Sequence, residues 1–258
     1  SVLVLICLIV ALFAISPLVY LAIEASQTGT DSWVWTFRMN TVWILWRSII
    51  LAISVAAGTL LIATPIAFLT SRTNIPFRRF WNLITTLPLV IPSYVGAYIF
   101  LSMMGPNGLL QKALSPITGI SQFPGLYGYT GSLLVLTFLN YPYVLLTLRS
   151  AMSQIDPSQE ESARILGLGR INIFRRVSIP QIRPALLSSG LLVALYTLSD
   201  FGAVSLLRYK TFTWSIYNQY EASFDRGSAA LLSVVLCLIA TIFVYMESTT
   251  RGKTSYFR

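Results

Sequence analysis

Long uncharged stretches constrain this chain more than any other feature. Of its 258 residues, 55% are hydrophobic and only 10% are charged, whereas a soluble domain carries about a quarter charged residues. One helical crossing of a bilayer needs about 20 apolar residues. Six intervals meet this need, at about 2–23, 48–71, 80–103, 132–149, 185–207 and 227–246. Nothing alternates as barrel strands do, so we predict an all-α polytopic membrane protein, a single domain over 1–258 with six transmembrane helices.

The lysine and arginine residues predict the orientation of these helices. With the N-terminus in the cytoplasm, twelve of the 18 cations lie in cytoplasmic segments, as the positive-inside rule requires. The loop between the fourth and fifth spans alone holds six of them. Topology therefore accounts for the net charge of +9, which does not indicate nucleic acid. We expect a multi-pass protein in a lipid bilayer, with both termini cytoplasmic.

The sequence lacks the residue clusters that catalysis or tight metal binding require. It has no histidine, and its two cysteines, Cys7 and Cys237, lie inside apolar runs. Of nine carboxylates, only Glu160 and Glu161 are adjacent. No phosphate-binding G-x-x-x-x-G-K-[ST] motif is present. We therefore expect no enzyme activity, no bound cofactor and no firm metal site on this chain.

The cytoplasmic stretch 156–184 is the one long segment that is both charged and patterned. Asp156 is a favoured helix N-cap, Pro157 suits the first helical position, and Gln159 completes a capping-box pattern. Gly167 then interrupts the helix before a second amphipathic piece begins. The pattern predicts a bent, two-part helical element outside the membrane.

This stretch resembles the EAA loop of ABC importer permeases. The family pattern is Glu-Ala-Ala, three residues, Gly, nine residues and Ile-x-Leu-Pro; here Ser162, Val177 and Ile179 replace the first Ala, the Ile and the Leu. In that family the loop docks on a cytoplasmic ATPase subunit. The resemblance implies that the loop 156–180 couples to the ATPase through Glu160, Glu161, Ser162, Ala163, Gly167 and Pro180. The alternative is an ordinary interfacial amphipathic helix.

Other segments resemble the ferric-iron branch of these permeases, namely LPLVIPSYVGAYIF, GPNGLLQ and SDFGAVSLLRYKTFTWSIY. The resemblance implies a type I importer fold and passage of ferric iron from a periplasmic or lipoprotein binding protein across the bacterial inner membrane. It implies two ATPase subunits, which carry ATP and Mg²⁺. It also implies a second permease half, fused or separate, with this chain as the N-terminal half. Thiamine, sulfate and polyamine permeases share the loop, so those substrates remain alternatives.

Asp200 is the one ionisable residue inside a predicted span. A carboxylate within a membrane normally faces a cavity or a partner, so Asp200 is a candidate for the translocation path. A structural role, as a cap at a helix break near Gly202 or a partner of Arg208, is the alternative. Further path candidates, each also a common helix-packing residue, are Ser93, Tyr94, Tyr98, Asn140 and Tyr143.

Prolines and short amphipathic segments predict irregularities in the bundle. Pro65 in the second span, and Pro88 and Pro92 in the third, predict kinked or broken helices. A short interfacial helix is expected around Leu109–Leu114.

An ion-coupled secondary transporter would use Asp200 without an ATPase. A membrane-embedded enzyme would need a clustered site, which the sequence lacks, and a scaffold or signalling subunit leaves the EAA spacing unexplained.

Overall fold

The computed structural model describes residues 2–29, 39–105, 108–118 and 126–251. Within these ranges every regular element is a helix. Five helices are long and apolar enough to cross a membrane, and a bent helix pair makes a sixth crossing if it is counted as one span. The five are Val4–Gln27, Asn40–Arg72, Gly128–Ser153, Ile171–Ser199 and Arg226–Thr249. The predicted all-α membrane class is confirmed.

Two compact units make up the chain. The first comprises Ser1–Ser48 and Lys210–Ile242, and the second comprises Ile49–Tyr209 and Phe243–Arg258. Helices α3 (Met39–Arg72) and α13 (Arg226–Arg251) contribute residues to both. The shorter helices are α6 (Leu109–Thr118), α8 (Pro157–Ile165), α9 (Arg170–Ile173), the π-helical turn η2 (Phe174–Ser178), α11 (Gly202–Leu206) and α12 (Phe212–Glu221).

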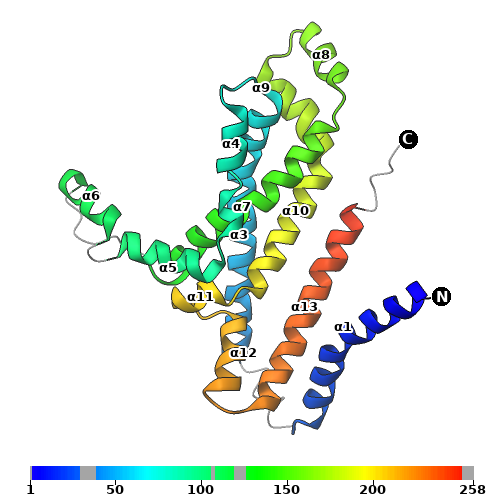
Figure 1. Cartoon of the computed structure of the whole chain (residues 1–258), viewed down its shortest axis with the longest axis vertical. Helices are drawn as coiled ribbons and strands as arrows, with labels where there is room; N and C mark the ends of the chain where they lie inside the picture. The colour runs from blue at the N-terminus through cyan, green and yellow to red at the C-terminus, as the bar shows by residue number, and fades with distance from the viewer. Residues whose placement is uncertain (1, 30–38, 106–107, 119–125, 252–258) are drawn as a thin grey trace. The chain divides into compact units, whose positions relative to one another are not determined.

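The core of the second unit lies between α3, α7 (Gly128–Ser153) and α10 (Ile179–Ser199), and α7 and α10 run side by side (Figure 1). Leu145 and Val193 are fully buried there. Short helices α8 and α9 lie at the end of this bundle where α3 and α7 terminate (Figure 1). The predicted cytoplasmic loop is therefore attached to one end of a packed helical core.

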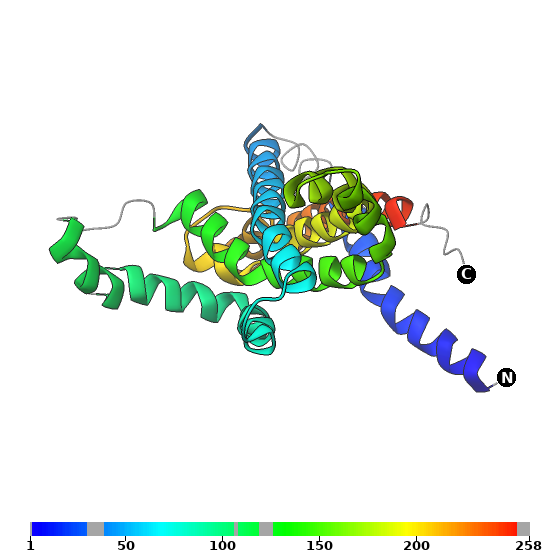
Figure 2. The ribbon, with the colours of Figure 1, turned by 90° about the horizontal axis from the view of Figure 1, so that it is seen from above.

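The third predicted span is broken, as its prolines predicted. It consists of α4 (Arg78–Ile84), a 3₁₀ turn η1 (Leu87–Val90) and α5 (Ser93–Met104). The segment Arg78–Val90 and the helical segment that begins at Ser93 are bent by 102°, and the change of direction is visible in Figure 1 and Figure 2. Pro88 is the second residue of the turn, and Pro92 is the N-cap of α5. By contrast, Pro65 lies inside the uninterrupted helix α3.

The fifth span ends earlier than the sequence pattern suggested. Helix α10 stops at Ser199, Asp200 is its C-cap, and the chain resumes as α11. The predicted limit of 207 thus includes a break and a second short helix. The expected helix near residue 109 is present as α6, four residues longer than predicted, ending at Thr118.

The first unit combines α1 (Val2–Gln27), α12 and the N-terminal part of α13. Ala25 packs with Ala230 and Leu231 in a small buried cluster. Asp225 precedes α13 and accepts hydrogen bonds from the Ser228 N–H (3.0 Å) and hydroxyl (2.6 Å). It therefore satisfies part of the helix N-terminus.

The cap at Asp225 predicts a pH-dependent contribution to stability. Hydrogen bonds from Ser228 lower the pKa of Asp225 below its usual range. The contribution should be complete above about pH 4, near the unfolded-state pKa, and be lost as the pH falls through the lowered pKa. We expect Asp225→Ala to reduce the free energy of unfolding by about 1 kcal/mol at pH 7. Chemical unfolding of the detergent-solubilised chain measures this.

The control is Glu221→Gln, which changes an exposed carboxylate on α12. A difference between wild type and Asp225→Ala that stays constant down to pH 2 would contradict the ionised cap.

Candidate functional site

The loop at 156–180 begins with a capped helix, α8. Asp156 has extended backbone angles and accepts a hydrogen bond from the Ser158 N–H at 2.9 Å, and Pro157 occupies the first turn. This bond lowers the pKa of Asp156. The predicted N-cap is confirmed. The Gln159 side chain, predicted to complete a capping box, accepts a hydrogen bond from the Gln181 side chain at 2.8 Å.

Gly167 is the point at which the loop bends. Its φ of +83° lies in the left-handed region. Residues with a Cβ adopt this backbone conformation only with strain. The Gly167 N–H donates to the Arg164 carbonyl (2.9 Å), and the Leu168 N–H donates to the Ala163 carbonyl (3.1 Å). These bonds close the last turn of α8 as in common glycine C-caps. The chain then re-enters helix at α9.

Large apolar side chains are exposed on both sides of this bend. Ile165, Leu166 and Ile171 are 86%, 82% and 74% exposed. They lie on a charged loop that the sequence places in water, where such a group of aliphatic side chains marks an interaction surface. We call these three residues the apolar tip.

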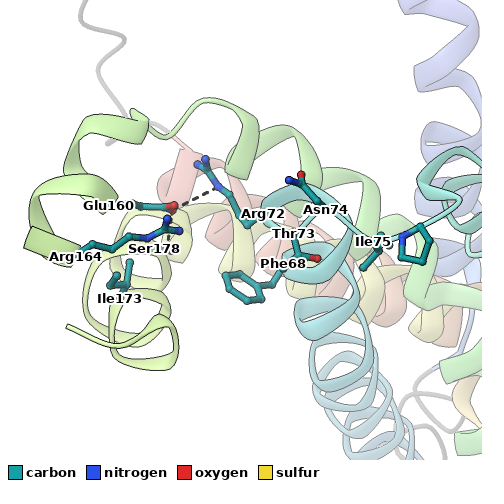
Figure 3. Close-up of a pocket in the computed structure, with 10 residues that line it drawn as sticks. Phe68, Arg72, Thr73, Asn74, Ile75, Glu160, Arg164, Ile173 and Ser178 are labelled. Atoms are coloured by element: carbon teal, nitrogen blue, oxygen red, sulfur yellow. Dashed lines mark hydrogen bonds and ion pairs between the residues drawn. The ribbon is translucent and has the colours of Figure 1, made fainter. Parts of the chain in front are cut away.

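The predicted coupling residues do not share one environment. Glu161 and Ser162 are exposed, Ala163 is buried, and Pro180 is exposed at the start of α10. Glu160 points back toward the helical bundle, not toward the solvent (Figure 3). Its carboxylate is therefore placed differently from that of its neighbour.

Glu160 contacts two other elements of the chain. Its Oε1 lies 3.5 Å from Arg72 Nε at the end of α3, with side-chain exposures of 12% and 16%. The same oxygen accepts a hydrogen bond from the buried Ser178 hydroxyl at 3.1 Å. These residues line a cavity of about 480 Å³ with Arg164 and Ile173 (Figure 3).

Sequence reasoning missed Arg72 and Ser178 as parts of this site. Arg72 is one of the twelve cations predicted to lie in cytoplasmic segments, and Ser178 occupies the variable position of the Ile-x-Leu-Pro pattern. The sequence gives no signal that joins residue 72 to residue 160. Only the packing of α3 against the loop brings them together.

A second cavity lies in the membrane region of the same unit. It measures about 360 Å³ and is bordered by the broken span together with α7 and α10. Ser93, Asn140 and Asp200, all predicted as path residues, line it, as do Tyr143 and Tyr196, whose ring centroids are 5.2 Å apart. The lining residues offer carboxylate, hydroxyl and amide oxygens and include no lysine or arginine.

Two of the predicted path residues lie elsewhere. Tyr94 and Tyr98 do not line the cavity and are 54% and 60% exposed. Ser93, the first residue of α5, does line it. Tyr196, a polar lining residue, was not singled out by the sequence analysis.

Asp200 has a structural role as well as a place in the cavity. It is buried, and its Oδ1 accepts a hydrogen bond from the Ala203 N–H at 3.0 Å, which caps α11 as one alternative foresaw. Ser93 also hydrogen-bonds its carboxylate. Arg208, the other suggested partner, lies over the Tyr127 ring at 5.1 Å. In the described residues, no group of three or more His, Cys, Asp or Glu side chains could hold a metal ion.

Comparisons with known proteins identify relatives over most of the chain. The model of the family described as binding-protein-dependent transport system inner membrane component matches residues 63–248. The Fe(3+)-transport system permease protein FbpB 2 of Haemophilus influenzae is 32% identical over 93% of this chain and 44% of its own length. The chain thus spans less than half of that relative. The molybdenum permease ModB of Escherichia coli K12 is 25% identical over 76% of this chain and 89% of its own.

Solved structures show the same fold. A bacterial ABC transporter that imports the acidic polysaccharide alginate matches with a TM-score of 0.74 and 17% identity, over 98% of this chain and 95% of that one. The inward-facing MetNI methionine ABC transporter matches with a TM-score of 0.62 and 15% identity, over 83% and 96%. The predicted type I importer permease fold is confirmed.

The close approach of α11 to α5 at this cavity predicts that Gly202 has no room for a side chain. A Cβ there would lie 3.0 Å from Ser93 Oγ and 3.1 Å from Tyr94 Cβ. We expect Gly202→Ala to lower the free energy of unfolding by about 1–3 kcal/mol, because α5 must shift. Gly169→Ala is the matched control, since nothing lies within 4 Å of its added Cβ. Equal unfolding midpoints of the two variants in detergent would contradict the close packing.

Proposed function

We propose that ferric iron is the substrate of this chain, which belongs to the family of binding-protein-dependent transport system inner membrane components. As a member of that family, the chain is a permease subunit of an ABC importer. The observation that carries the substrate assignment is the similarity to a Fe(3+) permease over 93% of the chain. The membrane cavity supports it, because hard cations favour oxygen ligands and the cavity is lined by carboxylate, hydroxyl and amide oxygens.

Oxyanions are the main rival substrates, since sulfate and molybdenum permeases are also similar to this chain. The cavity argues against them. A buried carboxylate, Asp200, faces it, and its lining includes no lysine or arginine. An oxyanion would meet repulsion there and find no cation to replace its hydration. Thiamine and polyamines are cations and remain the alternatives that the same cavity allows.

The apolar tip supports a partner ATPase as the source of energy. Its three exposed side chains, Ile165, Leu166 and Ile171, are held at a bend by Gly167. In the proposed cycle, closure of two ATPase subunits on ATP-Mg²⁺ pushes this loop. The broken third span and the break at Asp200 rearrange, and the cavity opens toward a loaded binding protein. After hydrolysis it faces inward.

The proposed assembly contains this chain, a second permease half, two ATPase subunits and an extracytoplasmic binding protein. We place it in the bacterial inner membrane with the loop and both termini in the cytoplasm, on the strength of the positive-inside bias.

The deciding experiment is ATPase activity of the reconstituted complex. Purified binding protein is added empty, Fe(III)-loaded, thiamine-loaded or sulfate-loaded. We expect stimulation by the Fe(III)-loaded form alone. Stimulation by another loaded form would keep the importer and change the substrate. Failure of any ATPase to associate with the chain would contradict the proposed partner.

Asp200 provides a test of the cavity itself. Asp200→Asn retains an oxygen that accepts the Ala203 N–H, so the α11 cap is preserved, but it removes the negative charge. We expect uptake of radiolabelled ferric iron into proteoliposomes to fall about tenfold or more, because one oxygen ligand loses its charge. Glu221→Gln, an exposed carboxylate outside the cavity, is the control. Unchanged iron uptake by Asp200→Asn would remove Asp200 from the path.

A further inference from the structure

The interior contacts of the loop form a connection between three helices. Glu160 on α8 lies beside Arg72 at the end of α3, and Ser178 at the end of η2 donates to the same carboxylate (Figure 3). Residue 72 and residue 160 are far apart in sequence, so this is a tertiary connection. The loop thus has a polar contact with the bundle in addition to the exposed apolar tip.

Arg72 is itself fixed to α7. Its Nη2 donates to the Met152 carbonyl at 2.6 Å and to the Ile155 carbonyl at 3.2 Å. Met152 lies in the last turn of α7 and Ile155 follows its C-cap, Gln154, in a region where unpaired carbonyl oxygens attract cations. Arg72 therefore joins α3, where it resides, to α7 and, through Nε, to the loop.

The Arg72–Glu160 contact is longer than a closed ion pair. Nε lies 3.5 Å from Oε1, and this buried nitrogen makes no hydrogen bond. A closed guanidinium–carboxylate pair has an N–O distance of about 2.8 Å. A buried donor without an acceptor is unfavourable. A small displacement of α8 toward α3 would therefore be favourable, because Arg72 Nε would gain a hydrogen bond to Glu160.

A second contact joins the same two segments. The ring of Phe174, at the start of the π-helical turn, lies 4.3 Å from that of Phe68, and Phe68 is one helical turn before Arg72 on α3. Turns of π-helix inside helices occur frequently at functional sites. The aromatic contact holds the loop beside α3, whereas the ion pair responds to how far α8 moves.

We propose that Arg72 is a positioning residue that transmits movement of the loop to α3 and α7, and that Glu160 acts on Arg72 within the chain, not on the ATPase. The proposal rests on the proposed function in one respect, namely that an ATPase moves the loop. The proposal gives two adjacent glutamates different roles. Glu161, which is exposed, faces the ATPase, whereas Glu160 contacts Arg72 within the permease. The pair closes when the ATPase presses α8 inward and reopens on its release.

Three variants test the pair. Glu160→Gln keeps an oxygen that accepts the Ser178 hydroxyl, and Arg72→Gln keeps N–H donors for the α7 carbonyls, so each removes mainly the charge. The third variant combines both changes. The loop keeps its separate Gln159–Gln181 contact with α10 in all three.

The measured quantity is iron transported per ATP hydrolysed, in proteoliposomes with the Fe(III)-loaded binding protein as the probe. We expect each single variant to lower this ratio about tenfold, with the amount of bound ATPase unchanged. The double variant should be no worse than either single one, because both remove the same interaction. Arg72→Lys, which keeps the charge, should recover part of the ratio. If Arg72→Gln does not insert, Glu160→Gln and Arg72→Lys still give the comparison.

Two controls separate this connection from ATPase docking. Arg79→Gln removes an exposed cation that does not line the cavity and should keep the wild-type ratio. Leu166→Asp places a charge on the apolar tip and should lose the bound ATPase itself. Glu160→Gln should instead keep it, a result that an ATPase-contacting Glu160 would not give.

Wild-type ratios in both single variants would overturn the proposal, as would losses that multiply in the double variant. Loss of ATPase from Glu160→Gln would assign that glutamate to the partner surface instead. A wild-type complex that holds no ATPase would overturn the proposed function together with this inference. If the wild-type complex and both single variants transport the same amount of iron per ATP, the inference is overturned and the proposed function stands.

Discussion

A backbone polar group inside a bilayer must find a partner within the protein, and each break in these helices depends on that constraint. The break after α4 shows how it is met. The Thr85 hydroxyl donates to the Trp81 carbonyl at 2.7 Å, and Thr86 donates to the Leu83 carbonyl at 2.9 Å. Arg149 on α7 then donates to the hydroxyls of Thr70 (3.0 Å) and Thr85 (2.8 Å). The broken span is thereby tied to α3 and α7.

Close helix contacts complete this arrangement. A Cβ at Gly58 would lie 3.1 Å from the Thr137 side chain, and one at Gly190 would lie 3.1 Å from Leu60. Small residues at such crossings let backbones approach, which is a main source of helix association in membranes. Beside the packed helices α3, α7 and α10, the described residues show breaks in the third span and at Asp200. These two irregular places border the same cavity, so the rigid helices define where a substrate passage can form.

Local features of the fold could be predicted from the sequence, whereas long-range pairings could not. The six apolar intervals, the Asp156 cap and the bend at Gly167 follow from composition or from residues a few positions apart. The end of α10 at Ser199 was missed because Phe201 to Leu207 is as apolar as the span before it. The Tyr143–Tyr196 contact and the Arg72–Glu160 pair each join distant segments. No periodicity records such a contact.

Glu160 and Glu161 show why residue type alone does not assign a role to each residue of the loop. One step along a helix turns a side chain by about 100°, so consecutive residues of α8 cannot face the same neighbour. Glu160 is turned to the bundle and is mostly buried, while Glu161 is exposed. In such a loop, exposed aliphatic side chains and an inward charge pair can serve two separate purposes. The first sets the affinity for a partner, and the second transmits the partner's movement to the helices. In the cycle that we propose, the apolar tip determines whether the ATPase binds, and the Arg72–Glu160 pair determines whether α3 and α7 respond.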